Sequence, residues 1–538
     1  MEKQNKFIIL VNTYNNEEWV EYNIASILNQ TYTNYEVKYT DDTSTDSTYE
    51  KAFELIGGNS QFSLVRRDTN MGGTFNHISY FSELQDDEIV LLLDGDDWFF
   101  DDTVLEKLNT FYNEKDCWMT YGGMYVYDGN QATEPFPQNT EYPPFVHEYK
   151  LYRKDLWRAS HLRSFRGFLV KSLDLTDFTS KISNKLFWHA GDLSLAFPCM
   201  EMAGQDRIGV IDFPAYVYNA TPKVQNRTQE RENTDNSKFE IEIRNKRKYK
   251  QGLTGEKLPN ILVKGDYQER HDIPKEFTYI YDAHNTEYDL VYLQDDAIID
   301  YLDGSDKDYN KTPIVVRICE NRKFFNQQKV IERTIAEFDK FDMILTWDKE
   351  VLKLPNARFC PLTGLTQFNM LPVTFDKEEL RVHNKTKEVS CVTSTKAFLP
   401  GHRTRLELVQ QIQHRVDLYG RGIREIASKL EALKDYRYSV VIENDISENY
   451  YTEKLTDCLL TGTIPIYYGC PNISEFFDIN GIHTFTTVEE LHKILDQLSQ
   501  EDYLSRLESI LHNYEVALTQ PLFNDDMYKN YYKDLLNM

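Results

Sequence analysis

The sequence contains little cysteine, no long apolar run and no excess of basic residues. Its seven cysteines are scattered, without a Cys-X-X-Cys pair or a Cys/His cluster, so neither a disulfide framework nor a zinc site is expected. No apolar run approaches the length of a membrane span, and the N-terminus carries no charged-then-apolar leader. These absences favour a reducing compartment, either the cytoplasm of the protein's own cell or, for a virus, that of the host.

The formal net charge of −26 argues against a general nucleic-acid or anionic-membrane surface, although it leaves room for a local basic groove. At 538 residues the chain is too long for one core, and its length predicts three or four domain-sized units. The 36 tyrosines and 30 phenylalanines suit stacking on sugars or bases, but they suit ordinary cores equally well.

Residues 90–99, VLLLDGDDWF, are the most informative local feature. The apolar run predicts a buried parallel strand, and Asp94, Asp96 and Asp97 follow at its carboxyl end, where open α/β sheets bind ligands. Adjacent carboxylates repel one another unless a cation neutralises them. Hard divalent ions such as Mg²⁺ or Mn²⁺ take oxygen ligands and share them with substrate phosphates. The alternative is a solvated acidic turn.

Residues 1–225 are predicted to form one α/β module, because strands alternate with helices at a spacing typical of a doubly wound parallel sheet. The predicted strands are 6–11, 35–39, 62–66 and 89–93, and the predicted helices are 19–28, 46–56, one from about 74, and 191–203. Residues 226–258 are expected to form a helical tail or linker. Its basic run 244–250 is more typical of a solvated helix face than of a phosphate contact.

A second α/β series begins near residue 260. The predicted strands are 261–263, 277–281, 314–318, 343–346, 390–393 and 439–442, and the predicted helices are 328–339, 403–415, 450–460 and most of 486–537.

Polar side chains follow the strands of the first module. Thr13 and Tyr14 come after the first strand, where a loop can meet a nucleotide base. The carboxylates of Asp41 and Asp42, after the second strand, can accept a ring N–H of uracil or guanine. Arg67 offers a cation near the same rim. These residues and the acidic turn together predict a site for a nucleotide diphosphate.

The motifs NTYNNEEWV…DDTSTDST (12–48), LLLDGDDWF (91–99), FRGFLVKS (165–172), AGDLSLAFPCMEMAG (190–204) and YVYN (216–219) resemble those of the family 2 glycosyltransferases, over residues 5–250. The resemblance implies a GT-A fold with one Rossmann-like sheet, a nucleotide sugar bound with Mn²⁺ or Mg²⁺ on Asp94 and Asp96, and transfer with inversion. Where the family often has Glu-Asp, this chain has Gly191-Asp192, so only Asp192 can inherit the role of general base. Taken alone, Asp192 could instead cap a helix.

Residues 443–471 form the strongest pattern of the second half. A predicted strand ends at Glu443-Asn444, and a helix opens near Tyr451. At that helix N-terminus Glu453 can hold ribose hydroxyls and Lys454 can meet a diphosphate. Upstream, Arg405 offers bidentate phosphate contacts that need no metal. Each of these charges could also be an ordinary surface charge.

The segments ENDISENYYTEKLTD (443–457), DLYGRG (417–422) and VVRICENRKFF (315–325) resemble the family 10 fucosyltransferases, over about 260–490. The resemblance implies a GT-B fold, with an acceptor-side half at 259–380 and a donor half with a helical tail at 381–538. It implies a GDP-sugar bound without a metal, with Glu320 as general base, although Cys319 replaces the usual glycine. The implied contacts are Arg405 and Lys454 to the diphosphate, Glu453 to the ribose, and Glu443, Asn444 and Tyr451 around the donor.

The leading hypothesis is therefore a bifunctional glycosyltransferase. Its first module would use a metal and a UDP- or GDP-type nucleotide sugar, and its second would add a fucose-like sugar from a GDP-sugar, together building one glycan. One alternative is a viral enzyme that glycosylates DNA bases, which the net charge disfavours. The other is a catalytically dead carbohydrate-binding scaffold. Retention of Asp94, Asp96, Asp192, Glu320 and Lys454 argues against the scaffold.

Overall fold

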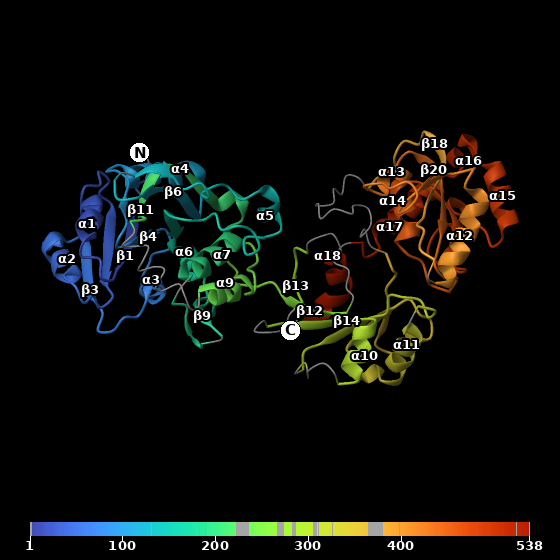
Figure 1. Cartoon of the computed structure of the whole chain (residues 1–538), viewed down its shortest axis with the longest axis horizontal. Coiled ribbons are helices and arrows are strands. Elements are labelled where there is room, and N and C mark those ends of the chain that lie inside the picture. Colours follow the sequence, from blue (N-terminus) through green and yellow to red (C-terminus); the bar gives the residue numbers. More distant parts are fainter. Residues whose placement is uncertain are drawn as a thin grey trace. The chain divides into compact units, whose positions relative to one another are not determined.

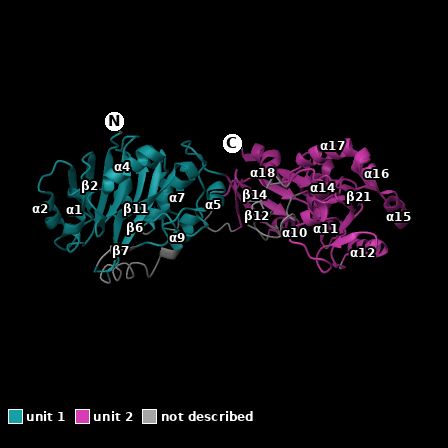
Figure 2. Cartoon of the chain, turned by 90° about the horizontal axis from the view of Figure 1, so that it is seen from above, with its two compact units in different colours: residues 1–258 teal, residues 259–538 magenta. Residues whose placement is uncertain are grey.

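The computed structural model of the chain describes residues 3–130, 132–181, 183–188, 190–221, 236–265, 274–281, 287–304, 309, 311–324, 326–363, 380–397, 399–522 and 524–536. The chain divides into two compact units, Met1–Leu258 and Pro259–Met538, which Figure 2 colours separately. Each unit is an α/β structure (Figure 1), as the sequence predicts. No helix in the described ranges is long and apolar enough to cross a membrane.

The first unit is built on one twisted sheet. Its first four strands are parallel, and their register sets Asn12 of β1 beside Asp94 of β4, and Thr13 beside Asp41 of β2. Beyond β4 the sheet is mixed, because β8 runs antiparallel to both β4 and β6. The strand order is β3 (Phe62–Arg66), β2 (Tyr35–Asp41), β1 (Phe7–Thr13), β4 (Ile89–Asp94), β8 (Arg163–Arg166), β6 (Met119–Tyr127), β11 (Ile208–Asn219) and β5 (Trp98–Phe99), with β7 (Ala132–Pro135) on β6.

Both faces of this sheet are buried, which explains the continuous apolar runs in its strands. In β4, Ile89, Leu91 and Leu93 pack into one core, whereas Val90 and Leu92 pack into the other. The helices are α1 (Val20–Leu28), α2 (Thr48–Ile56), α3 (Gly73–Phe81), α4 (Val104–Lys115), α5 (Pro144–Glu148), α6 (Gly167–Lys171), α7 (Gly191–Ala203) and α9 (Asn236–Arg244). The predicted strands and helices of residues 6–94 are confirmed within a few residues.

The described part of the expected tail, 236–258, belongs to the first unit, while 226–235 lie outside the described residues. Its basic residues are neither a solvated face nor a ligand site. Arg244 donates to the backbone oxygens of Arg153 and Asp155 (2.9 and 3.1 Å), and Lys248 is buried. Both interpretations of the run 244–250, as a solvated helix face and as a phosphate contact, are therefore corrected. Its cations hold the segment against the rest of the first unit.

The second unit contains two parallel sheets. The first has the order β13 (Thr278–Ile280), β12 (Asn260–Lys264), β14 (Leu290–Gln294), β15 (Ile314–Arg317), β16 (Met343–Thr346) and β17 (Ala357–Phe359). The second has the order β19 (Asp417–Tyr419), β18 (Lys387–Val392), β20 (Tyr436–Ile442), β21 (Ile464–Tyr468) and β22 (His483–Thr484). Two Rossmann-like sheets in one unit agree with the predicted GT-B architecture.

Helices cover both faces of each sheet. On the first sheet, α10 (Asp296–Leu302) and α11 (Gln327–Ala336) lie on one side of β12 and β14 (Figure 1), and α18 (Asn524–Met527) and α19 (Lys533–Leu536) lie on the other. The end of the helical tail thus returns to the first half of the unit. The helices of the second sheet are α12 (Pro400–Ile412), α13 (Leu430–Leu433), α14 (Glu453–Thr461), α15 (Val488–Gln497), α16 (Gln500–Ser505) and α17 (Leu507–Leu518).

Candidate active sites

The acidic turn of the first unit lies at the carboxyl end of β4. The Asn23 side chain of α1 donates to the backbone oxygens of Asp94 (3.0 Å) and Asp97 (2.7 Å), so it holds both ends of the turn. Between them the N–H of Gly95 donates to a backbone oxygen of β1 (2.8 Å). A Cβ on Gly95 would lie 2.5 Å from the Cβ of Thr13, so only glycine allows this close approach.

The carboxylates of the turn have different roles. Asp97 is buried and accepts hydrogen bonds from the hydroxyl of Tyr216 (2.6 Å) and the N–H of Asn219 (2.8 Å). Burial and the neighbouring Asp96 raise the pKa of Asp97 well above its ordinary value. Asp97 therefore anchors the turn to β11, which leaves Asp94 and Asp96 as the candidate metal ligands.

Asp94 and Asp96 form a donor set that suits Mg²⁺ or Mn²⁺. Burial and the charge of Asp96 raise the pKa of Asp94 to about 6, and a bound cation would relieve that repulsion. In the described ranges no group of three or more His, Cys, Asp or Glu side chains surrounds a common point. Two carboxylates are nevertheless enough for an ion that takes its other ligands from substrate phosphates and water.

His161 and Arg163 complete this edge of the sheet. The Nε2 of His161 lies 3.7 Å from Oδ2 of Asp94, and its ring stacks on Tyr216 with centroids 4.6 Å apart. Burial and the charge of Arg163 lower the pKa of His161 well below its usual value, so the ring is neutral at pH 7. Neither residue is evident as a site residue from the sequence. The run SHLRSFRG carries no signal for them, and the pairing of β8 with β4 brings them here.

Asp192 is the second residue of α7. Its Oδ2 accepts a hydrogen bond from the buried Arg163 (2.9 Å), and its charge contributes to the raised pKa of Asp94. The N-cap of α7 is Ala190 and no side chain caps the helix, so Asp192 does not serve as the cap. A Cβ on Gly191 would lie 2.1 Å from Oγ1 of Thr74, so glycine lets the start of α7 reach α3.

The two adjacent carboxylates after β2 serve different partners. Oδ2 of Asp41 accepts the N–H of Ser44 (3.1 Å), whereas its Oδ1 is buried and has no hydrogen-bond partner among the described residues. Asp42 accepts the N–H groups of Met71 (2.9 Å) and Gly72 (2.8 Å). Asp41 is therefore available to a base N–H. Asp42 instead holds the loop before α3, and we correct its predicted role accordingly.

Arg67 also has a structural task. Its guanidinium donates to two side chains of α3, Oδ1 of Asn76 (2.9 Å) and Oγ of Ser79 (3.0 Å). Arg67 therefore anchors α3, which differs from its predicted contact with the donor. Thr13 is buried at the end of β1, and Tyr14 is half-buried at the same edge of the sheet. Both stay candidates for the nucleotide site.

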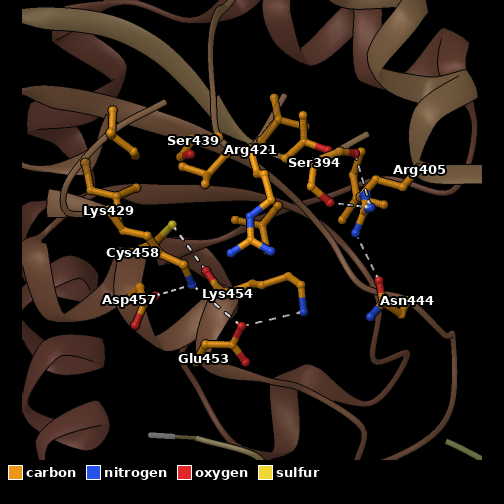
Figure 3. Close-up of a pocket in the computed structure, with 18 of the residues that line it drawn as sticks. Ser394, Arg405, Arg421, Lys429, Ser439, Asn444, Glu453, Lys454, Asp457 and Cys458 are labelled. Carbon is orange, nitrogen blue, oxygen red and sulfur yellow. Dashed lines mark hydrogen bonds and ion pairs between the residues drawn. The ribbon is translucent and has the colours of Figure 1, made fainter. Parts of the chain in front are cut away.

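The second unit has a pocket of 530 Å³ at the carboxyl ends of β18 and β20 (Figure 3). Val392, Val440 and Leu433 contribute apolar walls. The basic side chains that line it outnumber the acidic ones, with Lys396, Arg405, Arg421, Lys429 and Lys454 against Glu453 and Asp457. In a chain of net charge −26, this local excess of cations is what an anionic ligand requires.

Lys454 lies in the first turn of α14. Thr452 is the N-cap of this helix, and the buried Glu443 accepts hydrogen bonds from the N–H of Thr452 (2.9 Å) and from Nζ of Lys454 (3.3 Å). Burial alone would lower the pKa of Lys454, but Glu443 and Glu453 offset it and raise the pKa above its ordinary value. Glu443 does not line the pocket. It keeps Lys454 charged and in place.

Arg405 projects from α12. It donates to Oδ1 of Asn444 (3.2 Å) and to Oγ of Ser394 (3.2 Å), and its buried Nε has no partner among the described residues. A Cβ on Gly401 would lie 1.8 Å from the backbone oxygen of Asn444, so α12 can begin against this residue only with glycine. The N-terminus of α12 and Arg405 therefore face the same pocket.

Glu320 follows β15, in the other half of the unit. Burial and the charge of Asp295 raise the pKa of Glu320 to about 7, while Lys454 acts in the opposite direction. Glu320 is not among the residues that line the pocket, but Lys454 and Lys396, which do line it, both act to lower the pKa of Glu320. Oδ1 of Asp295 accepts the N–H of Cys319 (2.9 Å), which fixes the loop that carries Glu320. Asp295 is not evident from the sequence, because the central strand β14 that it follows is not among the predicted strands.

Tyr451 is not part of the pocket. Its buried ring packs against Phe476 and Phe477, with centroids 5.1 and 5.6 Å away, and its hydroxyl donates to Oε1 of Gln520 (3.2 Å). The predicted donor contact of Tyr451 is therefore corrected to a place in the core. Glu453, in contrast, lines the pocket as predicted, beside Lys454.

Two family models match the chain, one in each unit. Glycosyl transferase family 2 matches residues 8–175, and the C-terminal model of glycosyltransferase family 10 (fucosyltransferase) matches residues 382–508. The predicted resemblance to these two families is confirmed. The chain therefore carries a family 2 glycosyltransferase domain in its first unit and a family 10 glycosyltransferase domain in its second.

Curated relatives match the chain over short segments. A putative fucosyltransferase-like protein of Arabidopsis thaliana is 35% identical over 101 residues, which are 18% of this chain and 20% of the relative. GDP-fucose protein O-fucosyltransferase 3 of Gallus gallus is 34% identical over 74 residues (13% and 16%). Alpha-(1,3)-fucosyltransferase FucT of Helicobacter pylori is 32% identical over 68 residues (12% and 14%). The chain thus spans a fifth or less of the length of these relatives.

Solved structures are similar at low identity. S. aureus TarS 1-349 in complex with UDP-GlcNAc is 20% identical with a TM-score of 0.31, covering 40% of this chain and 58% of that chain. An alpha1,3-fucosyltransferase with GDP is 16% identical with a TM-score of 0.32, covering 52% and 91%. Mannosyltransferase PcManGT from Pyrobaculum calidifontis, in complex with GDP-Man and Mn2+, is 16% identical with a TM-score of 0.29, covering 40% and 57%.

Proposed function

We propose that the chain is a bifunctional glycosyltransferase. Its first unit transfers a sugar from a UDP- or GDP-type nucleotide sugar with inversion and with Mn²⁺ or Mg²⁺, and its second unit transfers a fucose-like sugar from a GDP-sugar to a glycan. The observation that carries the proposal is the second pocket. Arg405 and Lys454 line this pocket, and Glu320, whose pKa burial and Asp295 raise to about 7, follows β15 in the other half of the unit.

In the first unit, Asp94 and Asp96 would hold the metal ion, and the bound ion would supply positive charge to the diphosphate. Oδ1 of Asp41, which has no hydrogen-bond partner among the described residues, accepts an N–H of the base. Asp192 takes the proton of the acceptor hydroxyl, and Arg163 holds the carboxylate in the orientation that this transfer needs. Attack from the face opposite the nucleotide inverts the anomeric carbon.

In the second unit, basic side chains neutralise the diphosphate, as the metal would in the first unit. Arg405 and Lys454 bind the diphosphate, and Glu453 accepts hydrogen bonds from the ribose hydroxyls. Glu320 removes the acceptor proton, the acceptor oxygen bonds to the anomeric carbon, and the sugar–phosphate bond breaks. The released electron pair stays on the β-phosphate oxygen.

The two sites can be separated with one variant in each. We expect Asp96→Asn to abolish the metal-dependent turnover of a nucleotide sugar and to leave GDP-fucose turnover intact. We expect Lys454→Met to abolish GDP-fucose turnover and to leave the metal-dependent turnover intact. The matched controls are Asp212→Asn and Lys329→Met. Both residues are exposed, and the substitutions make the same changes of charge away from the two sites. The measurement is release of nucleoside diphosphate from UDP-, GDP- and CMP-sugars. If neither site variant changes any turnover, the assignment of two active sites fails, and if the wild type turns over no nucleotide sugar, the chain is a binding scaffold.

A further inference from the structure

Arg421 lies in a turn that packs closely against the residues after β18. Gly420 and Gly422 on either side have φ of +118° and +79°, a region that favours glycine. A Cβ on Gly420 would lie 1.9 Å from the backbone oxygen of Thr393, and one on Gly422 would lie 2.7 Å from Oγ1 of Thr395. Neither glycine tolerates a side chain, so the position of Arg421 between them is fixed by the backbone.

The guanidinium of Arg421 points into the pocket (Figure 3). It is exposed, and no described residue pairs with it. Two lysines of the pocket are already compensated, since Lys429 lies 2.8 Å from Asp457, and Lys454 lies 3.3 Å from Glu443. Lys396 and Arg421 are exposed cations of the pocket that form no ion pair with a described residue, and of these two only Arg421 has the planar fork that binds a phosphate in a bidentate way.

We propose that Arg421 is a further ligand of the donor diphosphate, one that stabilises the charge that appears when the sugar leaves. This inference rests on the proposed function of the second unit. When the sugar–phosphate bond breaks, its electron pair stays on the β-phosphate oxygen, the acceptor proton goes to Glu320, and the diphosphate gains one negative charge. An uncompensated guanidinium gains more from that charge than Lys454 does, because Glu443 already offsets Lys454.

The inference predicts that Arg421 favours the product over the donor. In the full chain, we expect Arg421→Gln to weaken binding of GDP about tenfold and binding of GDP-fucose no more than about threefold, with kcat reduced at least about tenfold. Arg421→Lys, which keeps the charge but loses the planar fork, should recover part of both.

Arg424→Gln is the matched control. Arg424 belongs to the same loop and carries the same charge, but its guanidinium lies over the ring of Tyr419 at 4.7 Å and does not line the pocket. We expect this variant to match the wild type in both affinities and in kcat. Calorimetric titration with GDP and GDP-fucose, and initial rates of GDP release, measure the difference.

The outcomes separate the two claims. If the wild-type chain binds neither GDP nor GDP-fucose, the proposed function of the second unit fails. If the wild type binds both and Arg421→Gln behaves like Arg424→Gln, Arg421 is not a ligand and the inference is overturned. Equal losses for GDP and GDP-fucose would also overturn it, because Arg421 would then bind without favouring the developing charge.

Discussion

The pH dependence of the second unit tests the role of Glu320. A general base must be ionised, and burial together with Asp295 raises the pKa of Glu320 to about 7 from an ordinary value of 4.5. The activity should therefore fall as the pH drops below about 7. A group of this pKa is ionised in roughly ten molecules of eleven at pH 8 and in roughly one of eleven at pH 6, so kcat/KM should fall about tenfold across that interval.

Asp295→Asn is the perturbation that identifies the group. The Asn side-chain oxygen can still accept the N–H of Cys319, but the charge that disfavours ionisation of Glu320 is gone. The pKa of Glu320 should therefore fall, and the acidic limb of the profile should move to lower pH. Lys396→Met removes a cation that lowers this pKa, so it should move the limb the other way.

The assay is GDP release from GDP-fucose with a glycan acceptor, followed from pH 5 to pH 9 for the wild type and both variants. The role of Glu320 is refuted if the limb lies near pH 4.5 and neither variant shifts it. A shift in the same direction for both variants would also refute it, because the two neighbouring charges have opposite signs.

Three further changes test the architecture of the first unit. Tyr216→Phe leaves buried Asp97 without its 2.6 Å hydrogen bond, so urea denaturation should show a loss of about 1–3 kcal/mol together with lower metal-dependent turnover, and an unchanged midpoint would contradict this. Arg153→Met breaks an ion pair with Glu201 whose side chains are 2% and 0% exposed, so the first unit should lose about 3–5 kcal/mol, and a loss below 1 kcal/mol would show that the pair is solvated. Treatment with EDTA should abolish turnover by the first unit, restored by Mn²⁺, and leave GDP-fucose turnover unchanged; equal inhibition of both would contradict the assigned division.

Much of the fold follows from local pattern. The strands β1 to β4 and the helices between them are evident from apolar runs and their period, because both faces of the sheet are buried and each strand carries its own signal. The motifs then fall at strand ends, as at Asp94 after β4. The later strands of the first unit escaped prediction, because they take their places through pairings with distant segments: β8 pairs antiparallel with β4, and β11 pairs parallel with β6.

Some site residues are evident from the local sequence, and others are identified only by the tertiary structure. The sequence by itself determined the alternation of strands and helices, the acidic turn, and the helix that carries Glu453 and Lys454, since each is encoded within a few neighbouring residues. Only the tertiary structure decided which polar groups are committed to the protein and which are free for a ligand. Asp97 is engaged by Tyr216, far along the chain, whereas the guanidinium of Arg421 has no partner among the residues that the structure describes. Hydrophobic period is a local property of the chain, but hydrogen-bond and charge compensation arise from contacts between distant segments, so they exist only once the fold has formed.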